Sequence, residues 1–87
     1  MIHFTLYSRS YCHLCDEMRL ALESLLGDIP YQLSIIDIDQ DPALVELYDE
    51  IVPVLFARKS TDLGSDLGQK LCHYFLDPVQ VKEFCND

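Results

Sequence analysis

Basic residues are scarce in this sequence: six Lys and Arg stand against 15 Asp and Glu, which gives a formal net charge of −9. This shortage argues against binding to nucleic acid, because that binding depends on neutralising phosphates. The sequence also lacks an apolar stretch long enough to cross a bilayer and the basic start and apolar run of a secretory signal. We therefore expect a cytoplasmic protein with no nucleic-acid or membrane partner. The acidic excess is interpreted as a solubility feature or, alternatively, as a bias toward neutral or basic partners.

No internal repeat and no linker interrupts the 87 residues, which predicts one domain over residues 1–87 and a monomer. Four cysteines would suggest a disulfide scaffold only in an extracellular protein. Their spacing is also uneven, with Cys12 and Cys15 close together and Cys72 and Cys85 far apart near the C-terminus. The close pair is therefore expected to be catalytic or metal-binding, and the other two to be ordinary buried thiols, since a cysteine without a partner behaves as a small hydrophobe.

The spacing of apolar residues predicts seven elements in the order β-α-β-α-β-β-α. The expected strands are 2–7, 31–38, 52–57 and 70–75. The expected helices are 13–26, 42 to 48 or 49, and 78–85, and residues 58–69 form a polar loop.

Local signals set the helix ends. Gly27 is placed to end the first helix, and Asp-Pro pairs at Asp41 and Asp77 start the other two, since the carboxylate caps exposed N–H groups and proline suits the first helical position. The two β-α-β passages predict parallel strands joined by right-handed crossovers, and the last two strands predict an antiparallel hairpin. The order resembles the thioredoxin fold in its smallest form, a four-stranded mixed sheet flanked by helices.

Cys12 and Cys15 form a C-x-x-C pair where the first strand gives way to the first helix. Unpaired N–H groups and the helix dipole favour an anion there, so the pKa of Cys12 is expected to fall below the roughly 8.5 of an unperturbed cysteine. Cys15 lies nearly one turn further on, within disulfide reach. We assign Cys12 as the nucleophile that attacks a substrate disulfide, and Cys15 as the residue that resolves the mixed disulfide.

The charged neighbours of the pair act in opposite directions. Arg9 is expected to place a positive charge near Cys12 and to stabilise its thiolate, whereas Asp16 and Glu17 oppose thiolate formation. His13 either assists when it is protonated or is simply a surface residue. The net expectation is a modest lowering of the pKa of Cys12.

Two motifs resemble those of glutaredoxins. In that family an aromatic–Ser–basic triplet precedes C-x-x-C. The segment Tyr7-Ser8-Arg9-Ser10-Tyr11-Cys12-His13-Leu14-Cys15 resembles this arrangement. Val52-Pro53 resembles the second family hallmark, a Val-Pro bond in the cis form at the start of the third strand. The resemblance covers essentially the whole chain and is strongest to small bacterial glutaredoxin-like proteins. It implies that substrate is bound by side chains before and within C-x-x-C and by the backbone at the proline: Arg9, Tyr11, His13, Val52 and Pro53.

The sequence departs from the family pattern at three places, which argues against strong glutathione binding and against full thioredoxin-like chemistry. Many glutaredoxins hold glutathione with a Gly-Gly-Asp-like motif after the fourth strand, but residues 72–78 contain no glycine, and only Asp77 is a candidate remnant. The usual Cys-Pro-Tyr-Cys is replaced by Cys-His-Leu-Cys. Leu6 stands where thioredoxins place a buried acidic residue. We expect weaker glutathione binding than in an ordinary glutaredoxin.

The resemblance implies thiol–disulfide exchange on a disulfide-containing protein or small molecule. Glutathione or a thioredoxin-reductase-type reductant restores the dithiol, and no metal or organic cofactor is needed. Two alternatives stay open: an iron–sulfur or other metal carrier that uses the same thiols, and a redox-inactive interaction domain. Structural zinc would need two further ligands. Cys72 with His73 is the only other cluster, and neighbouring residues of a strand point to opposite faces.

Overall fold

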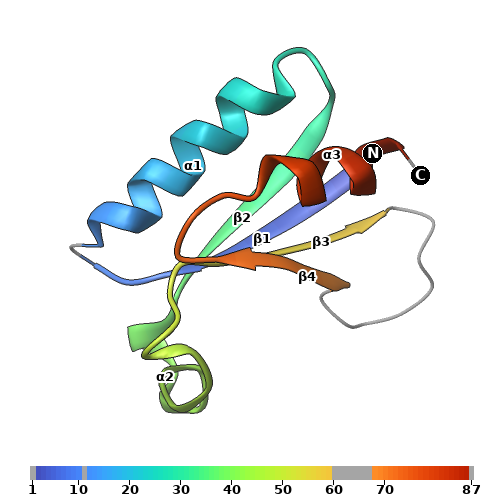
Figure 1. Cartoon of the computed structure of the whole chain (residues 1–87). Coiled ribbons are helices and arrows are strands. Elements are labelled where there is room, and N and C mark those ends of the chain that lie inside the picture. Colours follow the sequence, from blue (N-terminus) through green and yellow to red (C-terminus); the bar gives the residue numbers. More distant parts are fainter. Residues whose placement is uncertain (1, 11, 60–67, 87) are drawn as a thin grey trace.

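The computed structural model describes residues 2–10, 12–59 and 68–86 (Figure 1). Its elements in chain order are β1 (Ile2–Ser8), α1 (His13–Leu26), β2 (Tyr31–Asp37), the 3-10 helix η1 (Ile38–Gln40), α2 (Pro42–Tyr48), β3 (Val54–Lys59), β4 (Gln69–His73) and α3 (Pro78–Asn86). The strands form one mixed sheet in the order β2-β1-β3-β4. The predicted α/β architecture is therefore confirmed.

The directions of the strands differ from the prediction at one point. β1 is parallel to β2 but antiparallel to β3, so the expectation of parallel strands across the second β-α-β passage is wrong. The seven residues of α2 cover about 10 Å at 1.5 Å per residue, whereas the seven residues of β2 cover about 23 Å. Because α2 cannot carry the chain back along the sheet, β3 starts where β2 stops and runs the opposite way.

One end of the sheet consequently gathers several chain segments. Ser8 at the end of β1 pairs with Asp37 at the end of β2, and Val54 at the start of β3 lies opposite both Tyr7 and His73. The strands β1, β2 and β4 therefore end here, and β3 begins here. We call this the Ser8 end of the sheet.

Helices cover both faces of the sheet, as the resemblance to the thioredoxin fold implies. Phe4 and Leu6 of β1 pack in one cluster with Met18 and Leu22 of α1 and with Val81 of α3. A second cluster joins other β1 and β3 residues to α2 and η1, and its buried members are Tyr7, Ile38 and Val54. Figure 1 shows α1 and α3 together on one side of the sheet and α2 on the other.

The predicted ends of the helices agree closely with the structure. Helix α1 has the predicted bounds, and Gly27 ends it with a φ of 54° and an N–H that donates to the Glu23 carbonyl at 3.1 Å. The Asp41 carboxylate accepts the N–H of Ala43 at 3.0 Å, so it caps α2 as expected. Asp77 does the same for α3 with two N–H donors, those of Val79 and Gln80. That helix runs one residue further than predicted, to Asn86.

The observed bounds of the strands differ more from the predicted ones than those of the helices do. Strand β2 stops at Asp37, because residues 38–40 turn into η1. Strand β3 starts at Val54 and not at residue 52, since a proline has no N–H to give to the ladder. It also extends to Lys59, which shortens the predicted loop, whose residues 60–67 lie outside the described part of the chain. Strand β4 covers 69–73, and the chain leaves it at Tyr74, whose φ is 64°.

A bulge alters which side chains of β4 face the core. Leu55 pairs with Cys72 and Phe56 pairs with Lys70, so Leu71 is an extra residue on β4. Leu71 and Cys72 are both buried although they are consecutive. No helix among the described residues has the length and apolar character needed to cross a membrane.

Candidate active site

Cys12 and Cys15 form a disulfide at the N-terminus of α1, with 5.2 Å between their Cα atoms. Cys12 is the N-cap residue, and its Sγ accepts the N–H of Cys15 at 3.1 Å. A sulfur in this position receives both a hydrogen-bond donor and the positive end of the helix dipole, the two features that stabilise a thiolate. The predicted placement of the pair at a strand-to-helix junction is confirmed.

The two sulfurs differ in access. Cys15 is only 4% exposed, whereas Cys12 is half-buried. Attack on a substrate disulfide requires an accessible sulfur, so the difference favours Cys12 as the first nucleophile. Leu6 is buried on the α1 side of the sheet, so an apolar side chain occupies the position where thioredoxins place an acid.

The loop between β1 and α1 is tied to distant acidic residues. The guanidinium of Arg9 donates to Asp39 in η1 through Nη2 at 2.8 Å and through Nε at 3.4 Å, and it also pairs with Asp49 at the end of α2. The backbone carbonyl of Arg9 accepts the N–H of Cys12 at 3.3 Å. Arg9 thus connects the loop between β1 and α1 to two other elements, and its positive charge is shared with two carboxylates.

Ser10 adds a second tie between the same segments. Its hydroxyl donates to Oδ2 of Asp37 at 3.0 Å, and Oδ1 of Asp37 accepts the N–H of Asp39 at 2.9 Å. Two successive loop residues are therefore held by the turn that follows β2. Sequence reasoning did not find Asp39 and Asp49, because they lie 30 and 40 residues from Arg9 along the chain.

His13 lies on the surface of α1. Its side chain is 88% exposed, and Nε2 is 3.3 Å from Oε1 of Glu17, one turn along the helix. This geometry favours the surface alternative for His13. Asp16 instead lines a crevice of about 50 Å³ that also contacts Cys15 and Arg9. Tyr11, which the resemblance assigned to substrate binding, lies outside the described residues.

The Val52–Pro53 bond is cis, as the resemblance implied. Its backbone already has partners within the chain: the N–H of Val52 donates to the Tyr48 carbonyl at 3.1 Å, and the carbonyl of Pro53 accepts the N–H of Tyr74 at 2.9 Å. The N–H of Val52 is therefore engaged within the chain and not open to a substrate segment while it is bound to Tyr48. The resemblance also implies that Pro53 faces the two sulfurs, and this stays a prediction.

Tyr74 is a residue that sequence reasoning missed. It has a positive φ, its N–H is bound by Pro53, and its hydroxyl donates to the carbonyl of Glu50. Its ring also packs edge-on against His73, with 4.9 Å between ring centroids. Tyr74 therefore fastens the segment before β3 to the end of β4. Glycine adopts positive φ without steric cost. The glycines that the family places in this region therefore indicate a left-handed backbone here, although this chain has Tyr74 instead.

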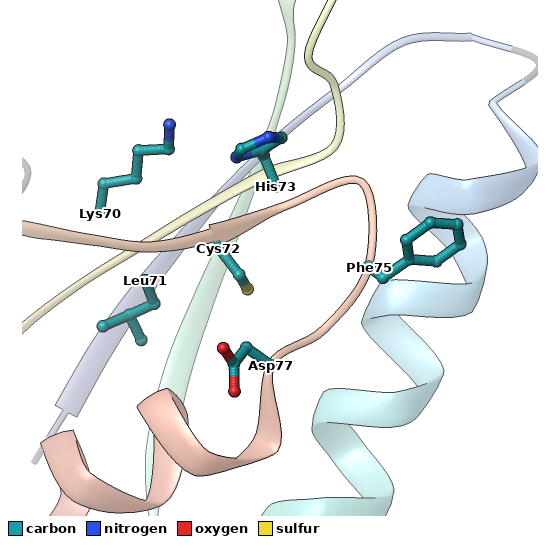
Figure 2. A pocket seen from close by; sticks show the side chains of 6 residues that line it. All are labelled: Lys70, Leu71, Cys72, His73, Phe75 and Asp77. Atoms are coloured by element: carbon teal, nitrogen blue, oxygen red, sulfur yellow. The ribbon is translucent and has the colours of Figure 1, made fainter.

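Cys72 lies on the opposite side of β4 from His73. Figure 2 shows the Cys72 side chain directed toward Asp77 and the His73 ring on the other face of the strand, beside a pocket that both residues line. The two side chains thus lie on opposite faces of the strand, as predicted for neighbouring strand residues. Burial raises the pKa of the Cys72 thiol, although the backbone N–H of Asp77 acts in the opposite direction, and burial also raises the pKa of Cys85. Among residues 2–10, 12–59 and 68–86, no group of three or more His, Cys, Asp and Glu is placed to hold a metal.

The sheet order, the helices on both faces and the C-x-x-C pair at the start of α1 together define a thioredoxin-like fold with a dithiol site. Solved structures agree: mitochondrial thioredoxin 3 from Saccharomyces cerevisiae, in its oxidized form, has a TM-score of 0.66 at 17% identity, covering 99% of this chain and 77% of that one. The chain belongs to the glutaredoxin-like family, since the family described as Glutaredoxin-like domain (DUF836) matches residues 3–85.

Two similar solved structures come from structural genomics. Protein Ne2328 from Nitrosomonas europaea is 36% identical with a TM-score of 0.77, covering 95% of this chain and 89% of its own. Target protein XcR50 from X. campestris is 28% identical with a TM-score of 0.63, covering 95% of both chains. No protein with a curated description matches the chain.

Proposed function

We propose that this protein is a thiol–disulfide oxidoreductase in which Cys12 attacks a disulfide and Cys15 resolves the product. The observation that carries the proposal is the Cys12–Cys15 pair at the N-terminus of α1, with Cys12 the more accessible sulfur. Membership of the glutaredoxin-like family supports the same reading.

The exchange takes two steps that transfer two electrons. The Cys12 thiolate attacks one sulfur of the substrate disulfide, so that a mixed disulfide forms while the other substrate sulfur leaves as a thiolate and takes up a proton. Cys15 then loses its proton and attacks the Cys12 sulfur, which forms the intramolecular disulfide and releases the second substrate sulfur. The substrate is thereby reduced to two thiols, and the protein is oxidised.

Glutathione or a thioredoxin-reductase-type system supplies the two electrons that regenerate the dithiol. The scheme uses no metal and no organic cofactor, and it suits a reducing compartment such as the cytosol, where C-x-x-C pairs serve catalysis more often than structure. The substrate is a disulfide in a protein or in a small molecule.

A single-turnover assay tests this function. Fully reduced protein is mixed with a peptide that contains one disulfide, and the products are followed by mass spectrometry after acid quenching. Intact protein should release reduced peptide, Cys15→Ser should accumulate the mixed disulfide on Cys12, and Cys12→Ser should do neither. Cys72→Ser is the matched control and should behave like the intact chain.

The same preparation separates the proposal from metal carriage. Protein purified without oxygen should contain neither zinc nor iron in stoichiometric amounts and should have two thiols that are oxidised together. Stoichiometric metal that is lost in Cys12→Ser, together with no reduction of the peptide, would overturn the redox function. Regeneration is then measured with glutathione and with a thioredoxin-reductase system in parallel.

A further inference from the structure

Acidic residues gather at the Ser8 end of the sheet. The strand directions bring three segments to this end: the turn after β2, helix α2 with its C-terminal end, and the first turn of α1. Together they carry eight carboxylates: Asp16, Glu17, Asp37, Asp39, Asp41, Glu46, Asp49 and Glu50.

The basic residues do not balance these charges. Lys59 lies opposite Ile2, at the other end of β1, and Arg58 lies next to it. Lys70 lies near the start of β4, away from the Ser8 end, and Lys82 lies in α3. Near the redox pair there are two arginines, and both are ion-paired: Arg9 with Asp39 and Asp49, and Arg19 with Glu23. A substrate that approaches Cys12 therefore meets a negative field, which attracts positively charged partners and repels negative ones.

A groove on α2 lies within this acidic region. It has a volume of about 430 Å³, and it is lined by three apolar residues, Val45, Leu47 and Ile51, and by three acidic residues, Glu46, Asp49 and Glu50. Leu47 is 65% exposed, which leaves an apolar surface in the groove without cover from the described residues around it.

The groove is connected to the loop between β1 and α1 through one ion pair. Asp49 lines the groove and binds the guanidinium of Arg9, whose carbonyl in turn accepts the N–H of Cys12. A polypeptide with a disulfide at Cys12 has only to extend past Arg9 to reach the groove.

We propose that this groove docks an extended, basic segment of a substrate protein, with an apolar side chain against Leu47 and lysine or arginine side chains beside Glu46 and Glu50. The inference rests on the proposed oxidoreductase function and specifies the substrate class. Charge complementarity is the main argument: a groove lined by both apolar and acidic residues selects a segment that is itself apolar and basic. Acidic segments are disfavoured by the same charges.

The test compares three peptides of equal length with the same disulfide and one leucine, flanked by lysine, glutamine or glutamate. The second-order rate of reduction by the fully reduced protein is measured for each one. At low ionic strength the lysine peptide should react at least about tenfold faster than the glutamate peptide, and the difference should shrink as salt screens the charges. Glu46→Gln with Glu50→Gln should remove most of that preference, and Leu47→Asn should slow all three peptides.

The control variant is Asp28→Asn with Glu83→Gln, which removes the same charge from α3 and from the turn before β2 and should keep the preference. Equal rates for the three peptides, or equal loss in the control variant, would overturn the groove while leaving the redox function intact. Failure of the protein to reduce any peptide would instead refute the function itself. A dimer in solution that dissociates in Leu47→Asn would show that a second copy occupies the groove, and would also overturn the proposal.

Discussion

Nη2 of Arg9 lies 2.8 Å from Oδ1 of Asp39, and the same guanidinium also pairs with Asp49. The hydrogen bond to Asp39 is the main reason why the pKa of Arg9 is raised above its ordinary value. The arginine was expected to act on the Cys12 thiolate through its charge, but two carboxylates from η1 and α2 share that charge. Arg9 thus links the loop between β1 and α1 to the α2 side of the sheet.

Releasing Arg9 should increase the reactivity of Cys12. In a Cys15→Ser background, Asp39→Asn with Asp49→Asn leaves the guanidinium without its carboxylates, so a positive charge near the sulfur favours the thiolate. Alkylation of Cys12 at pH 6 to 7 should then become faster by about threefold to tenfold. Labelling kinetics with a thiol reagent measure the change.

Two further variants separate charge from other effects. Glu23→Gln frees Arg19, the other ion-paired arginine on this side, and should leave the labelling rate of Cys12 nearly unchanged. Adding Arg9→Gln to the variant with Asp39→Asn and Asp49→Asn should abolish the increase in the labelling rate of Cys12. An equal rate in all of these variants would show that the charge of Arg9 does not reach the thiolate.

Cys12 should react with alkylating reagents before Cys15. Cys15 is almost fully buried, and Cys12 caps the helix with its sulfur on an N–H donor. Peptide mapping after brief labelling of the reduced protein at pH 7 should find Cys12 modified at least about ten times faster than Cys15. Cys72 serves as the internal reference for a buried thiol, and faster modification of Cys15 than of Cys12 would reverse the assigned roles.

Sequence reasoning succeeded where local rules decide the structure. The bounds of α1, the stop at Gly27, and the caps at Asp41 and Asp77 depend on residues within one helical turn of one another. The C-x-x-C pair and its place at the helix start were also readable from the sequence alone. The cis bond at Pro53 came from the family resemblance, because propensity alone favours trans.

The remaining features depend on tertiary structure. The direction of β3 follows from the short span of α2 and from pairing with β1, which no local pattern records. The partners of Arg9 come together only when the ends of β1, β2 and α2 meet. The left-handed backbone of Tyr74 runs against the preference of a large side chain, and two hydrogen bonds to residues more than 20 positions earlier hold it.

Gly68 should tolerate alanine far less well than Gly27. Both have positive φ, but a Cβ at Gly68 would overlap the carbonyl oxygen of Ala57 and lie 2.6 Å from Cβ of Arg58, whereas a Cβ at Gly27 meets nothing within 4 Å. Gly27→Ala should lower the free energy of unfolding by about 1 to 2 kcal/mol through backbone strain alone. Gly68→Ala adds a clash with backbone and should cost at least about 3 kcal/mol. Urea denaturation of the two variants measures the difference, and equal losses would contradict it.

The folded protein should lose stability at alkaline pH because of Cys72. Burial raises the pKa of this thiol, so the folded state holds its proton to a higher pH than the unfolded state does. The resulting stabilisation is complete below the pKa of the unfolded thiol, roughly 8.5, and is lost as the pH rises through the folded pKa. The urea midpoint of the disulfide-intact protein should therefore fall between pH 7.5 and 10.

Replacement of the thiol tests that cause directly. Cys72→Ala should show a smaller decrease of the urea midpoint over the same pH range, and Cys85→Ala should show a lesser correction, because Cys85 is less deeply buried than Cys72. A decrease that is identical in Cys72→Ala and in the unchanged chain would assign the alkaline loss to other groups.

Glutathione should bind weakly, and Tyr74 is the structural reason. Tyr74 stands directly after β4, where glutaredoxins use glycines to let the tripeptide approach. Its N–H is bound to Pro53 and its hydroxyl to Glu50, which hold its side chain against the segment before β3. Asp39 and Asp49 also compete with a glutathione carboxylate for the guanidinium of Arg9. We expect a Kd of about 1 mM or weaker for glutathione disulfide, which is about 4 kcal/mol of binding free energy.

Calorimetric titration of a Cys12→Ser variant that also carries Cys15→Ser measures that affinity without thiol exchange. In the same background, Tyr74→Gly removes the side chain and suits the positive φ, so binding should tighten by about tenfold if the tyrosine is the obstacle. Tyr74→Phe is the matched control, because it keeps the ring and loses only the hydroxyl, and it should stay weak. Tight and saturable binding by the chain with Tyr74 in place would show that glutathione is held by another route, since neither the missing glycines nor the paired Arg9 would then limit it.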